Sequence, residues 1–396
     1  MPISATTIKR CIVTIAAMLV GLCVIAPLSA APTVDDLWNG KAHFEQVGEL
    51  NWSAAPGQRD ESAGWFTVRD GVWYAFNRAY INAKVDYCSL DHTRVVVRES
   101  RDDGKSWSKP VVAIEPGDSR MGDECSALDG SSYYDAPTGT WHILAQCLTR
   151  DERSAWAMCH YSRKAASPVG RFTADPANPV VRGGALWSQI CAGTGKACPA
   201  TTQDEGTPEI IEKRDGRFIV TMHGYDPVSR FGFRGVVATK DFRTWSTSGV
   251  GLPGDAMFGP KDCQSWLKGC IGTGAVTTLL TKNYAYLVGE VMDKGLGCQT
   301  DQRWIFEIFR IPRGPWPRSG SGQWQKLPGP PLLAPSWPDP ATLCQVAYAR
   351  WVVDGADIYL IYEDWGQQRK FVDRRLLKLV SGGGQRVQLK PLTARP

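Results

Sequence analysis

The chain has 396 residues, with 45 Lys and Arg against 40 Asp and Glu, so its formal net charge is +5. This small positive excess is scattered, and the sequence shows neither a concentrated basic stripe nor a nucleic-acid reading module, which argues against nucleic acid as a partner. After residue 30 no apolar run is long enough to cross a bilayer, so stable membrane insertion is not expected.

The first thirty residues have the organisation of a secretory signal peptide. A basic start at Lys9 and Arg10 precedes an apolar run over Cys11–Leu28 and small residues before Ala31. Cleavage there removes two basic and no acidic residues, which lowers the charge from +5 to +3. The alternative is an uncleaved membrane anchor, since roughly 18 to 20 residues can span a bilayer. A cleaved signal predicts a secreted or periplasmic protein.

Ten of the twelve cysteines follow residue 30, and in an oxidising compartment an even number predicts disulfides. Spacing suggests three pairs: Cys191–Cys198, Cys263–Cys270 and, flanking a predicted hairpin, Cys147–Cys159. The pairing of the others stays open: Cys88, Cys125, Cys298 and Cys344. Zinc binding is the alternative role for these cysteines. The chain has no CxxC pair and no HExxH motif, so no metal site is predicted.

Strand signals dominate the rest of the chain. Short runs rich in Val, Ile, Tyr, Phe and Trp alternate with Gly, Pro, Asp and Asn. An apolar stretch, a tight turn and an aromatic-rich apolar stretch recur five times, and successive turns are 68, 77, 67 and 72 residues apart. The turns are centred on Gly71, Gly139, Gly216, Asn283 and Gly355.

This repeat predicts an all-β, five-bladed β-propeller. A unit of about 70 residues with two hairpins suits a four-stranded blade, and radial repetition covers sheet edges. We expect residues 31–396 to form a single propeller domain, with blades from about residue 60 to residue 382. Residues 31–59 and the tail from Ser381 are expected to close or cap the ring. The alternative is a β-sandwich whose hairpins merely look alike.

Two segments are expected to form the outer hairpin turns of blades. The segment Ser100–Trp107 fits the pattern SxDxGxxW, the Asp-box of sialidases and many other propellers, and Ala238–Trp245 is a looser relative. In this motif Asp and Gly close the turn while Trp packs between sheets. We therefore predict a structural role for Asp102 and Asp103.

One position recurs ten or eleven residues before each repeated turn. In the five units it is occupied by Asp60 and Glu61, Asp129, Glu205, Thr273 and Gln345. The first strand of each propeller blade lines the central channel, so these positions should converge near the axis. Carboxylates gathered there would push one another's pKa values apart, as acid/base catalysis requires. The plainer interpretation is that each acid caps a loop or pairs with a nearby Arg.

Two of these units resemble the five-bladed glycosidases that include α-L-arabinofuranosidases, β-xylosidases and endo-arabinanases. Asp129–Asp135 is similar to the second-blade segment of that group. Asp204–Lys213 is similar to the third-blade segment, in which a Glu-Gly-Pro stretch carries the general acid. The resemblance covers all five units in spacing and these two segments in detail.

The resemblance implies an inverting glycoside hydrolase acting on an arabinan- or xylan-type substrate. Glu205 would be the general acid, and Asp129 would raise its pKa and orient it. The family has an Asp-Pro on the first blade where this chain has Asp60-Glu61, so either residue could be the base, with Asp60 preferred. Inversion needs acid and base roughly 6.5 to 9.5 Å apart, to admit a water.

Four residues are predicted to bind the sugar: Trp65, Tyr133, His223 and Gln345. The aromatic side chains would stack on sugar faces, with core packing as the alternative for each. His223 would line the site or hold a central water or a structural calcium ion, as in some relatives. No cofactor is required, and the protein is expected to bind carbohydrate as a monomer.

Three other functions compete with this prediction. A sialidase needs three converging arginines and a Tyr/Glu nucleophile pair, and the inner-strand regions offer Arg59, Arg69 and Arg350. A non-catalytic carbohydrate-binding propeller would keep the aromatic residues without an acid/base set. A lyase would release unsaturated products. The sugar, the linkage and the choice between exo and endo cleavage stay open.

Overall fold

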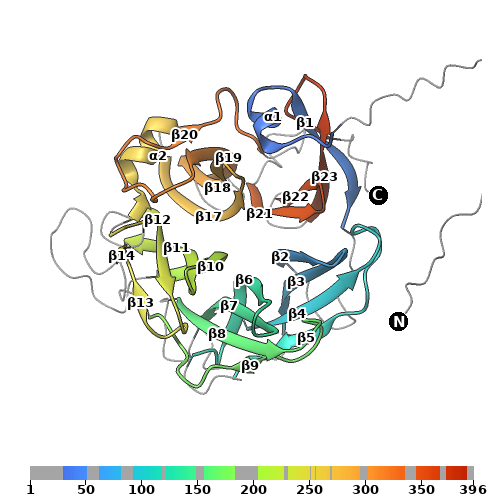
Figure 1. The fold of residues 1–396 in the computed structure, drawn as a ribbon, viewed down its shortest axis with the longest axis vertical. Helices are drawn as coiled ribbons and strands as arrows, with labels where there is room; N and C mark the ends of the chain where they lie inside the picture. The colour runs from blue at the N-terminus through green and yellow to red at the C-terminus, as the bar shows by residue number, and fades with distance from the viewer. Residues whose placement is uncertain are drawn as a thin grey trace, which may run out of the picture. The chain divides into compact units, whose positions relative to one another are not determined.

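The computed structural model describes residues 30–50, 62–81, 92–117, 122–148, 156–182, 204–226, 231–249, 251–254, 256–267, 270–294, 302–334, 345–365 and 372–389. The predicted signal peptide lies outside these ranges. Within them, the strands form five antiparallel blades around one axis (Figure 1). The prediction of an all-β, five-bladed propeller is confirmed.

Each blade begins with three antiparallel strands and ends with an outer strand. Blade 1 consists of β2 (Ser62–Arg69), β3 (Val72–Tyr80), β4 (Thr93–Ser100) and β5 (Val111–Ile114). Blade 2 consists of β6 (Ser126–Asp135), β7 (Thr140–Leu148), β8 (Ala157–Lys164) and β9 (Thr173–Ala174). Blade 3 consists of β10 (Asp204–Arg214), β11 (Arg217–Asp226) and β12 (Phe231–Thr239), with β13 (Trp245–Ser246) and β16 (Ala256–Phe258) both paired to β12.

The remaining strands and two short helices complete the described fold. Blade 4 consists of β17 (Cys270–Leu280), β18 (Tyr284–Lys294), β19 (Gln302–Pro312) and β20 (Gln325–Lys326). Blade 5 consists of β21 (Gln345–Asp354), β22 (Asp357–Trp365), β23 (Val372–Ser381) and β1 (Ala42–Glu49), beside which β24 (Val387–Gln388) runs parallel. A small hairpin pairs β14 (Ser248–Gly249) with β15 (Leu252–Pro253), and the helices are α1 (Val34–Trp38) and α2 (Pro260–Trp266).

The ring is closed by the beginning of the described chain. Strand β1 pairs antiparallel with β23, so the first strand in sequence is the outer strand of the last blade, and Figure 1 shows the blue β1 beside the red β23. The innermost strands contact one another in the order β2, β6, β10, β17, β21 and back to β2. The prediction that residues 31–59 help to close the ring is confirmed for β1, and the sandwich alternative is wrong.

The repeated turns are the hairpins between the first two strands of each blade. Asp70 and Gly71 both have positive φ (53° and 71°), as do Asp215 and Gly216 (51° and 70°). This is the left-handed conformation of a type I′ turn, whose twist matches that of the paired strands and which favours Asp-Gly. Local sequence therefore determines where these hairpins turn.

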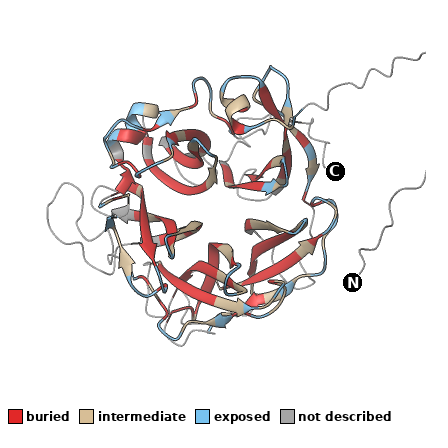
Figure 2. Ribbon diagram, viewed as in Figure 1, coloured by how far each residue is buried: buried red, intermediate tan, exposed pale blue. Residues whose placement is uncertain are grey.

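Apolar side chains are buried between successive blades. Five clusters fill the five interfaces, and Figure 2 shows buried residues following the strands of every blade. Between blades 4 and 5, for example, Phe44 of β1 packs beside Trp351 of β21 with ring centroids 6.0 Å apart. Burying each such side chain contributes about 1.5 to 3 kcal/mol. Most of this apolar burial thus lies between blades.

The turn between β4 and β5 is held by its own polar side chains. Ser100 Oγ accepts the Gly104 N–H at 3.0 Å, and the Asp102 carboxylate accepts the Ser106 N–H at 2.9 Å. Hydrogen bonds from Ser106 lower the pKa of Asp102 to about 2. The Trp107 indole donates to the Gly104 carbonyl at 2.9 Å. Asp102 therefore stabilises a turn, as predicted.

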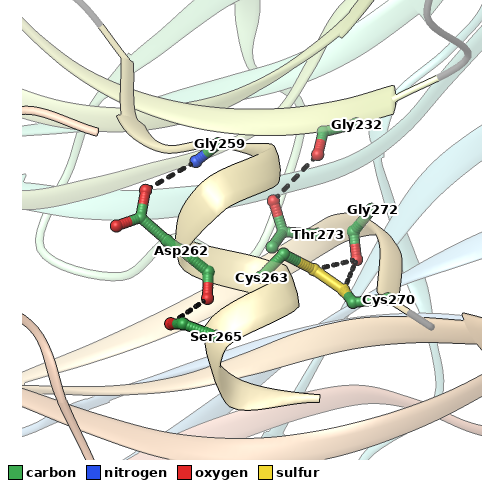
Figure 3. Close-up of a disulfide and its surroundings, with 8 residues drawn as sticks. All are labelled: Gly232, Gly259, Asp262, Cys263, Ser265, Cys270, Gly272 and Thr273. Atoms are coloured by element: carbon green, nitrogen blue, oxygen red, sulfur yellow. Dashed lines mark hydrogen bonds between the residues drawn. A yellow bond between two sulfur atoms is a disulfide. The ribbon is translucent and has the colours of Figure 1, made fainter. Parts of the chain in front are cut away.

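Two predicted disulfides are present. Cys147–Cys159 joins β7 to β8, and Cys263–Cys270 joins α2 to the first residue of β17 (Figure 3). Cys125 is also disulfide-bonded, while Cys191 and Cys198 lie outside the described residues. Among the helices of the described segments, none combines the length and apolar character needed to cross a bilayer.

Candidate active site

Every innermost strand is interrupted by a β-bulge before its hairpin turn. The register shifts fall at Ser62/Gly64, Ala127/Gly130, Gly206/Glu209, Thr273/Val276 and Ala347/Arg350. A bulge bends its strand and re-aims side chains, and bulges are common next to active sites. Since the five innermost strands contact one another in a ring, the bulges surround one central region. Of the described positions predicted from the repeat, Asp129 lies within its bulge and Thr273 at the edge of its bulge, and Glu205 and Gln345 lie one and two residues before theirs.

Two bulges contain strained residues. Thr207 and Tyr348 have φ of +39° and +56°, in the left-handed region that β-branched and bulky residues rarely adopt. Such a conformation costs of the order of 1–3 kcal/mol and persists only where surrounding contacts enforce it. The Thr207 N–H donates to Gln146 Oε1 at 2.9 Å, and the Tyr348 N–H donates to Glu290 Oε1 at 3.3 Å.

Asp129 is buried on β6 and faces an arginine of the neighbouring blade. Its Oδ1 lies 3.9 Å from Nη1 of Arg78, which belongs to β3. Nη2 of the same Arg78 donates to the Tyr348 hydroxyl at 3.2 Å. The Arg78 guanidinium thus connects three blades and places a positive charge beside Asp129. The expectation that Asp129 pairs with a nearby Arg is therefore met. The bulge that contains Asp129 is one of the five that surround the central region.

Glu290 of β18 is a second carboxylate in this region. Its Oε2 accepts the Ala275 N–H at 2.8 Å and its Oε1 accepts the Tyr348 N–H, so it joins the bulges of blades 4 and 5. Burial raises the pKa of Glu290 to about 7, and the charge of Asp129 adds to the rise, while the two backbone donors and Arg350 oppose it.

A further pair of charged side chains, Glu209 and Arg234, belongs to strands of blade 3. Glu209 of β10 accepts the Thr278 N–H at 2.7 Å and the Thr278 hydroxyl at 2.6 Å. Arg234 of β12 is fully buried and donates to Thr207 Oγ1 at 2.8 Å and to the Gly274 carbonyl at 3.3 Å. Burial raises the pKa of Glu209 and lowers that of Arg234, and each charge opposes the shift of the other. This network holds the bulges of blades 3 and 4 together.

The structure locates the predicted general acid by its backbone. Glu205 lies on β10 opposite Gly224. Gly206, the next residue, packs so closely on Gln146 of β7 that an added Cβ would collide with its amide oxygen. The Glu205 segment is therefore pressed against blade 2, the blade that carries Asp129. A side chain at position 206 would have to displace the Gln146 amide, which accepts the Thr207 N–H.

The fourth-blade position has a structural role. The Thr273 hydroxyl donates to the Gly232 carbonyl at 3.1 Å, beside the bridge that joins β12 to β17 (Figure 3). This bond ties blade 3 to blade 4, which accounts for a hydroxyl at a position that carries an acid in three other units. Asp60 and Glu61 of the first unit lie outside the described residues.

The predicted sugar-binding residues separate into different environments. Trp65 is only 2% exposed and stacks on Phe76 with ring centroids 5.3 Å apart, so it belongs to the core between blades 1 and 2, and its indole has no exposed face for a sugar. Tyr133 is half-buried and packs edge-on against Phe218 at 5.6 Å, between blades 2 and 3. For both, core packing accounts for the position. For Gln345 the backbone is described, opposite Trp365.

His223 lies close to the candidate acid. It stands on β11 opposite Gly206 and is half-buried. Burial, and then the charge of Arg234, lower the pKa of His223 to about 3, so the imidazole is neutral at ordinary pH. Calcium prefers oxygen ligands, and a neighbouring guanidinium disfavours a cation, so the described surroundings of His223 do not fit direct calcium binding. In the described segments, no three His, Cys, Asp or Glu side chains are grouped to hold a metal.

Four residues of this region were not singled out from the sequence: Arg78, Arg234, Glu290 and Tyr348. They lie on second, third and first strands of different blades, so no local motif contains them. A usable signal existed for Glu290, a carboxylate within the apolar strand run Leu287–Met292. A buried acid in such a run needs hydrogen-bond or charged partners, and buried acids with perturbed pKa values often lie at functional sites.

These features define the class of protein: a five-bladed β-propeller whose bulged innermost strands surround buried charged groups. The chain matches no protein-family model, and no curated protein sequence matches it.

Solved structures nevertheless share the fold. A structure described as a glycoside hydrolase has a TM-score of 0.58 at 11% identity, over 91% of this chain and 96% of that one. A thermostable family-43 glycoside hydrolase has a TM-score of 0.53 at 13% identity, over 84% and 95%. An exo-1,5-α-L-arabinanase from a bovine ruminal metagenomic library has a TM-score of 0.51 at 15% identity, over 83% and 96%. At such low identity the similarity establishes the fold.

Proposed function

We propose that this protein is a secreted glycoside hydrolase that cleaves an arabinan- or xylan-type polysaccharide with inversion. The observation that carries the proposal is the placement of Asp129 and the Glu205 backbone on contacting innermost strands, at bulges that surround the ring centre. The shared fold with a family-43 glycoside hydrolase and an exo-arabinanase supports it. The signal-like N-terminus and the disulfides support secretion.

In the proposed mechanism Glu205 donates its proton to the departing glycosidic oxygen as the bond to the anomeric carbon breaks. Asp60 or Glu61 takes a proton from a water that attacks the opposite face of that carbon. Asp129 lies on the innermost strand next to that of Glu205, and in this mechanism its negative charge raises the pKa of Glu205 so that the acid is protonated. The Arg78 guanidinium beside Asp129 favours the charged form of Asp129 that this role needs.

The first experiment is reducing-sugar release by the purified protein from arabinans, xylans, galactans and sialosides, run beside Glu205→Gln. We expect release from one arabinan- or xylan-type polymer and a loss of about 10²- to 10⁴-fold in the variant, because the leaving group is no longer protonated. Glu212→Gln is the matched control, since Glu212 is on the same strand at its turn end and pairs with Arg313 at 3.2 Å.

Each alternative result has a distinct meaning. Full activity in Glu205→Gln would contradict the assignment of the acid. Polymer binding without release by either protein would identify a carbohydrate-binding propeller. Release from sialosides alone would favour a sialidase, and unsaturated products would identify a lyase. If release occurs, NMR of the first product should show an inverted anomeric configuration, and comparison of Asp60→Asn with Glu61→Gln should identify the base.

The proposal includes a monomer that needs no cofactor. Sedimentation of the purified protein should give the mass of one chain. Chelation of divalent ions should leave kcat unchanged, whereas loss of activity that calcium restores would require a metal site.

A further inference from the structure

A pocket lies at the outer part of blade 3, far from the candidate acid. It has a volume of about 370 Å³, within the size range of sites for small ligands. Its lining includes Arg217, Lys240, Asp241, Thr244, Trp245 and Ser246, from the start of β11, the turn after β12, and β13.

The pocket and the candidate acid are at opposite ends of the same sheet. In the β10–β11 pair, Glu205 lies opposite Gly224, whereas Arg214 at the other end lies opposite Arg217. Nine residues of strand separate Glu205 from Arg214, which corresponds to about 30 Å. A ligand in this pocket would therefore not touch the candidate acid.

The charges of the pocket favour an anion. In the part of the chain that the structure describes, the Arg217 guanidinium and the Lys240 ammonium form no hydrogen bond or ion pair. The Asp241 carboxylate, in contrast, accepts the N–H groups of Arg243 at 2.9 Å and Thr244 at 2.8 Å. Among the described residues, the two cations of this pocket are thus left without a hydrogen-bond or ion-pair partner, whereas its carboxylate is already hydrogen-bonded.

The aromatic wall of the pocket is held in place. Trp245 is half-buried, and its indole N–H donates to the Val180 carbonyl at 3.1 Å. The side chain also packs edge-on against Phe242, with ring centroids 6.4 Å apart. A fixed aromatic ring beside cationic donors suits a sugar ring that carries a carboxylate.

The equivalent turn of blade 1 lacks this combination. The turn after β12 in blade 3 corresponds to the turn after β4 in blade 1. In blade 3 the Thr239 hydroxyl accepts the Phe242 N–H at 2.9 Å, and in blade 1 the Ser100 hydroxyl accepts the Gly104 N–H at 3.0 Å. In blade 1 the place of Lys240 is taken by Arg101, which pairs with Glu99 at 3.3 Å. The place of Arg217, directly after the first hairpin turn, is taken by Val72. The described part of blade 1 therefore has no counterpart of the two blade 3 cations at this turn.

We infer that the blade 3 pocket is a second carbohydrate site, which binds a uronic acid residue of an acidic polysaccharide through Arg217, Lys240 and Trp245. The sugar carboxylate meets the two cations and the sugar ring lies against the indole. Such a site anchors polymer on a part of the molecule remote from bond cleavage.

The test is calorimetric titration of the purified protein with trigalacturonate at low salt, compared with its methyl ester. We expect the free acid to bind more tightly than the ester and to weaken as salt is added, since exposed charges are screened. In Arg217→Gln/Lys240→Gln the affinity should fall by about tenfold. Arg101→Gln, at the same turn position of blade 1, is the matched control and should bind as the parent does.

Any of four results would overturn the inference. The acid and the ester could bind equally, the double variant could keep the affinity of the parent, or Arg101→Gln could lose as much affinity as the double variant. The fourth is that inorganic phosphate displaces bound trigalacturonate at the concentration at which free trigalacturonate does. The double variant should hydrolyse a small chromogenic arabinofuranoside as the parent does, because Arg217 and Lys240 lie outside the proposed catalytic site. Binding is measured independently of hydrolysis, so failure of the proposed hydrolase activity would leave this test intact.

Discussion

At the scale of single residues, the centre of the ring depends on side chains that satisfy bulged backbone. A bulge frees N–H groups from the strand ladder, and a buried N–H without an acceptor is costly. Glu290 accepts two of them, from Ala275 and Tyr348, and Gln146 accepts a third from Thr207. Polar side chains thus support the left-handed conformations of Thr207 and Tyr348.

The raised pKa of Glu290 makes stability depend on pH. Its pKa is about 7 in the folded protein against 4.5 for an ordinary Glu, so the folded state holds the proton more tightly. The stability from this proton is complete below about pH 4.5 and is lost as pH rises through about 7. In Glu290→Gln that loss should disappear, which changes the free energy of unfolding between these pH values by roughly 3 kcal/mol relative to the parent.

Urea unfolding at several pH values from 4.5 to 8 checks this prediction. Asp103→Asn, an exposed change in the blade 1 turn, is the control and should keep the slope of the parent. The same slope in Glu290→Gln and in the parent would show that folding does not raise the pKa of Glu290.

At the scale of elements, strands β7 and β8 carry a pair of histidines against blade 3. His142 Nδ1 lies 3.0 Å from His160 Nε2, and His160 Nδ1 lies 3.3 Å from the Asp175 carboxylate. The Phe242 ring stacks on His160 with centroids 4.1 Å apart. Burial lowers the pKa of both histidines to about 4, and for His142 the charge of His160 adds to the decrease.

This pair predicts acid sensitivity of the contact between blades 2 and 3. An unfolded His has a pKa of 6.5, so the unfolded chain takes up protons first as pH falls. Stability from the neutral pair is complete above about pH 6.5 and is lost towards pH 4. In His142→Gln the slope over this range should be shallower by up to about 1.4 kcal/mol per pH unit.

Thermal unfolding of the parent and His142→Gln between pH 4 and 7 measures this difference. Because Glu290 acts in the opposite direction over much of this range, the comparison is made again in the Glu290→Gln background. Identical slopes with and without His142 would contradict the prediction.

At the scale of the whole molecule, stability depends on closure of the ring by β1. Phe44 is fully buried between blades 4 and 5, whereas Val47 on the same strand is 45% exposed. Phe44→Ala should lower the free energy of unfolding by about 3 to 5 kcal/mol, because it leaves a cavity at the closing interface. Val47→Ala is the matched control and should change stability by less than about 0.5 kcal/mol.

Chemical denaturation of the two variants tests this expectation. A small loss in Phe44→Ala, similar to that of Val47→Ala, would show that the ring holds without the β1 contact.

The sequence alone predicted features that depend on neighbours in the chain. Asp-Gly pairs specify the left-handed turns, a recurring unit specifies the blades, and short spacing specifies Cys147–Cys159 and Cys263–Cys270. The location of Asp129 on an innermost strand also follows from the same repeat, whereas the bulge at that position is a feature of the structure. These features are local, or they repeat locally, so a linear pattern contains them.

Only the tertiary structure decided which side chains meet. Arg78, Asp129 and Tyr348 lie on β3, β6 and β21, and they meet because the ring brings blades 1, 2 and 5 together. The alternation of residues along a strand also does not reveal which face of the strand the next blade covers. For this reason Trp65 was predicted to stack on a sugar, whereas it lies in the core between blades 1 and 2. The repeat determined the architecture, and the packing of blades determined the partners of its charges, since those partners are distant in the chain and close only around the ring.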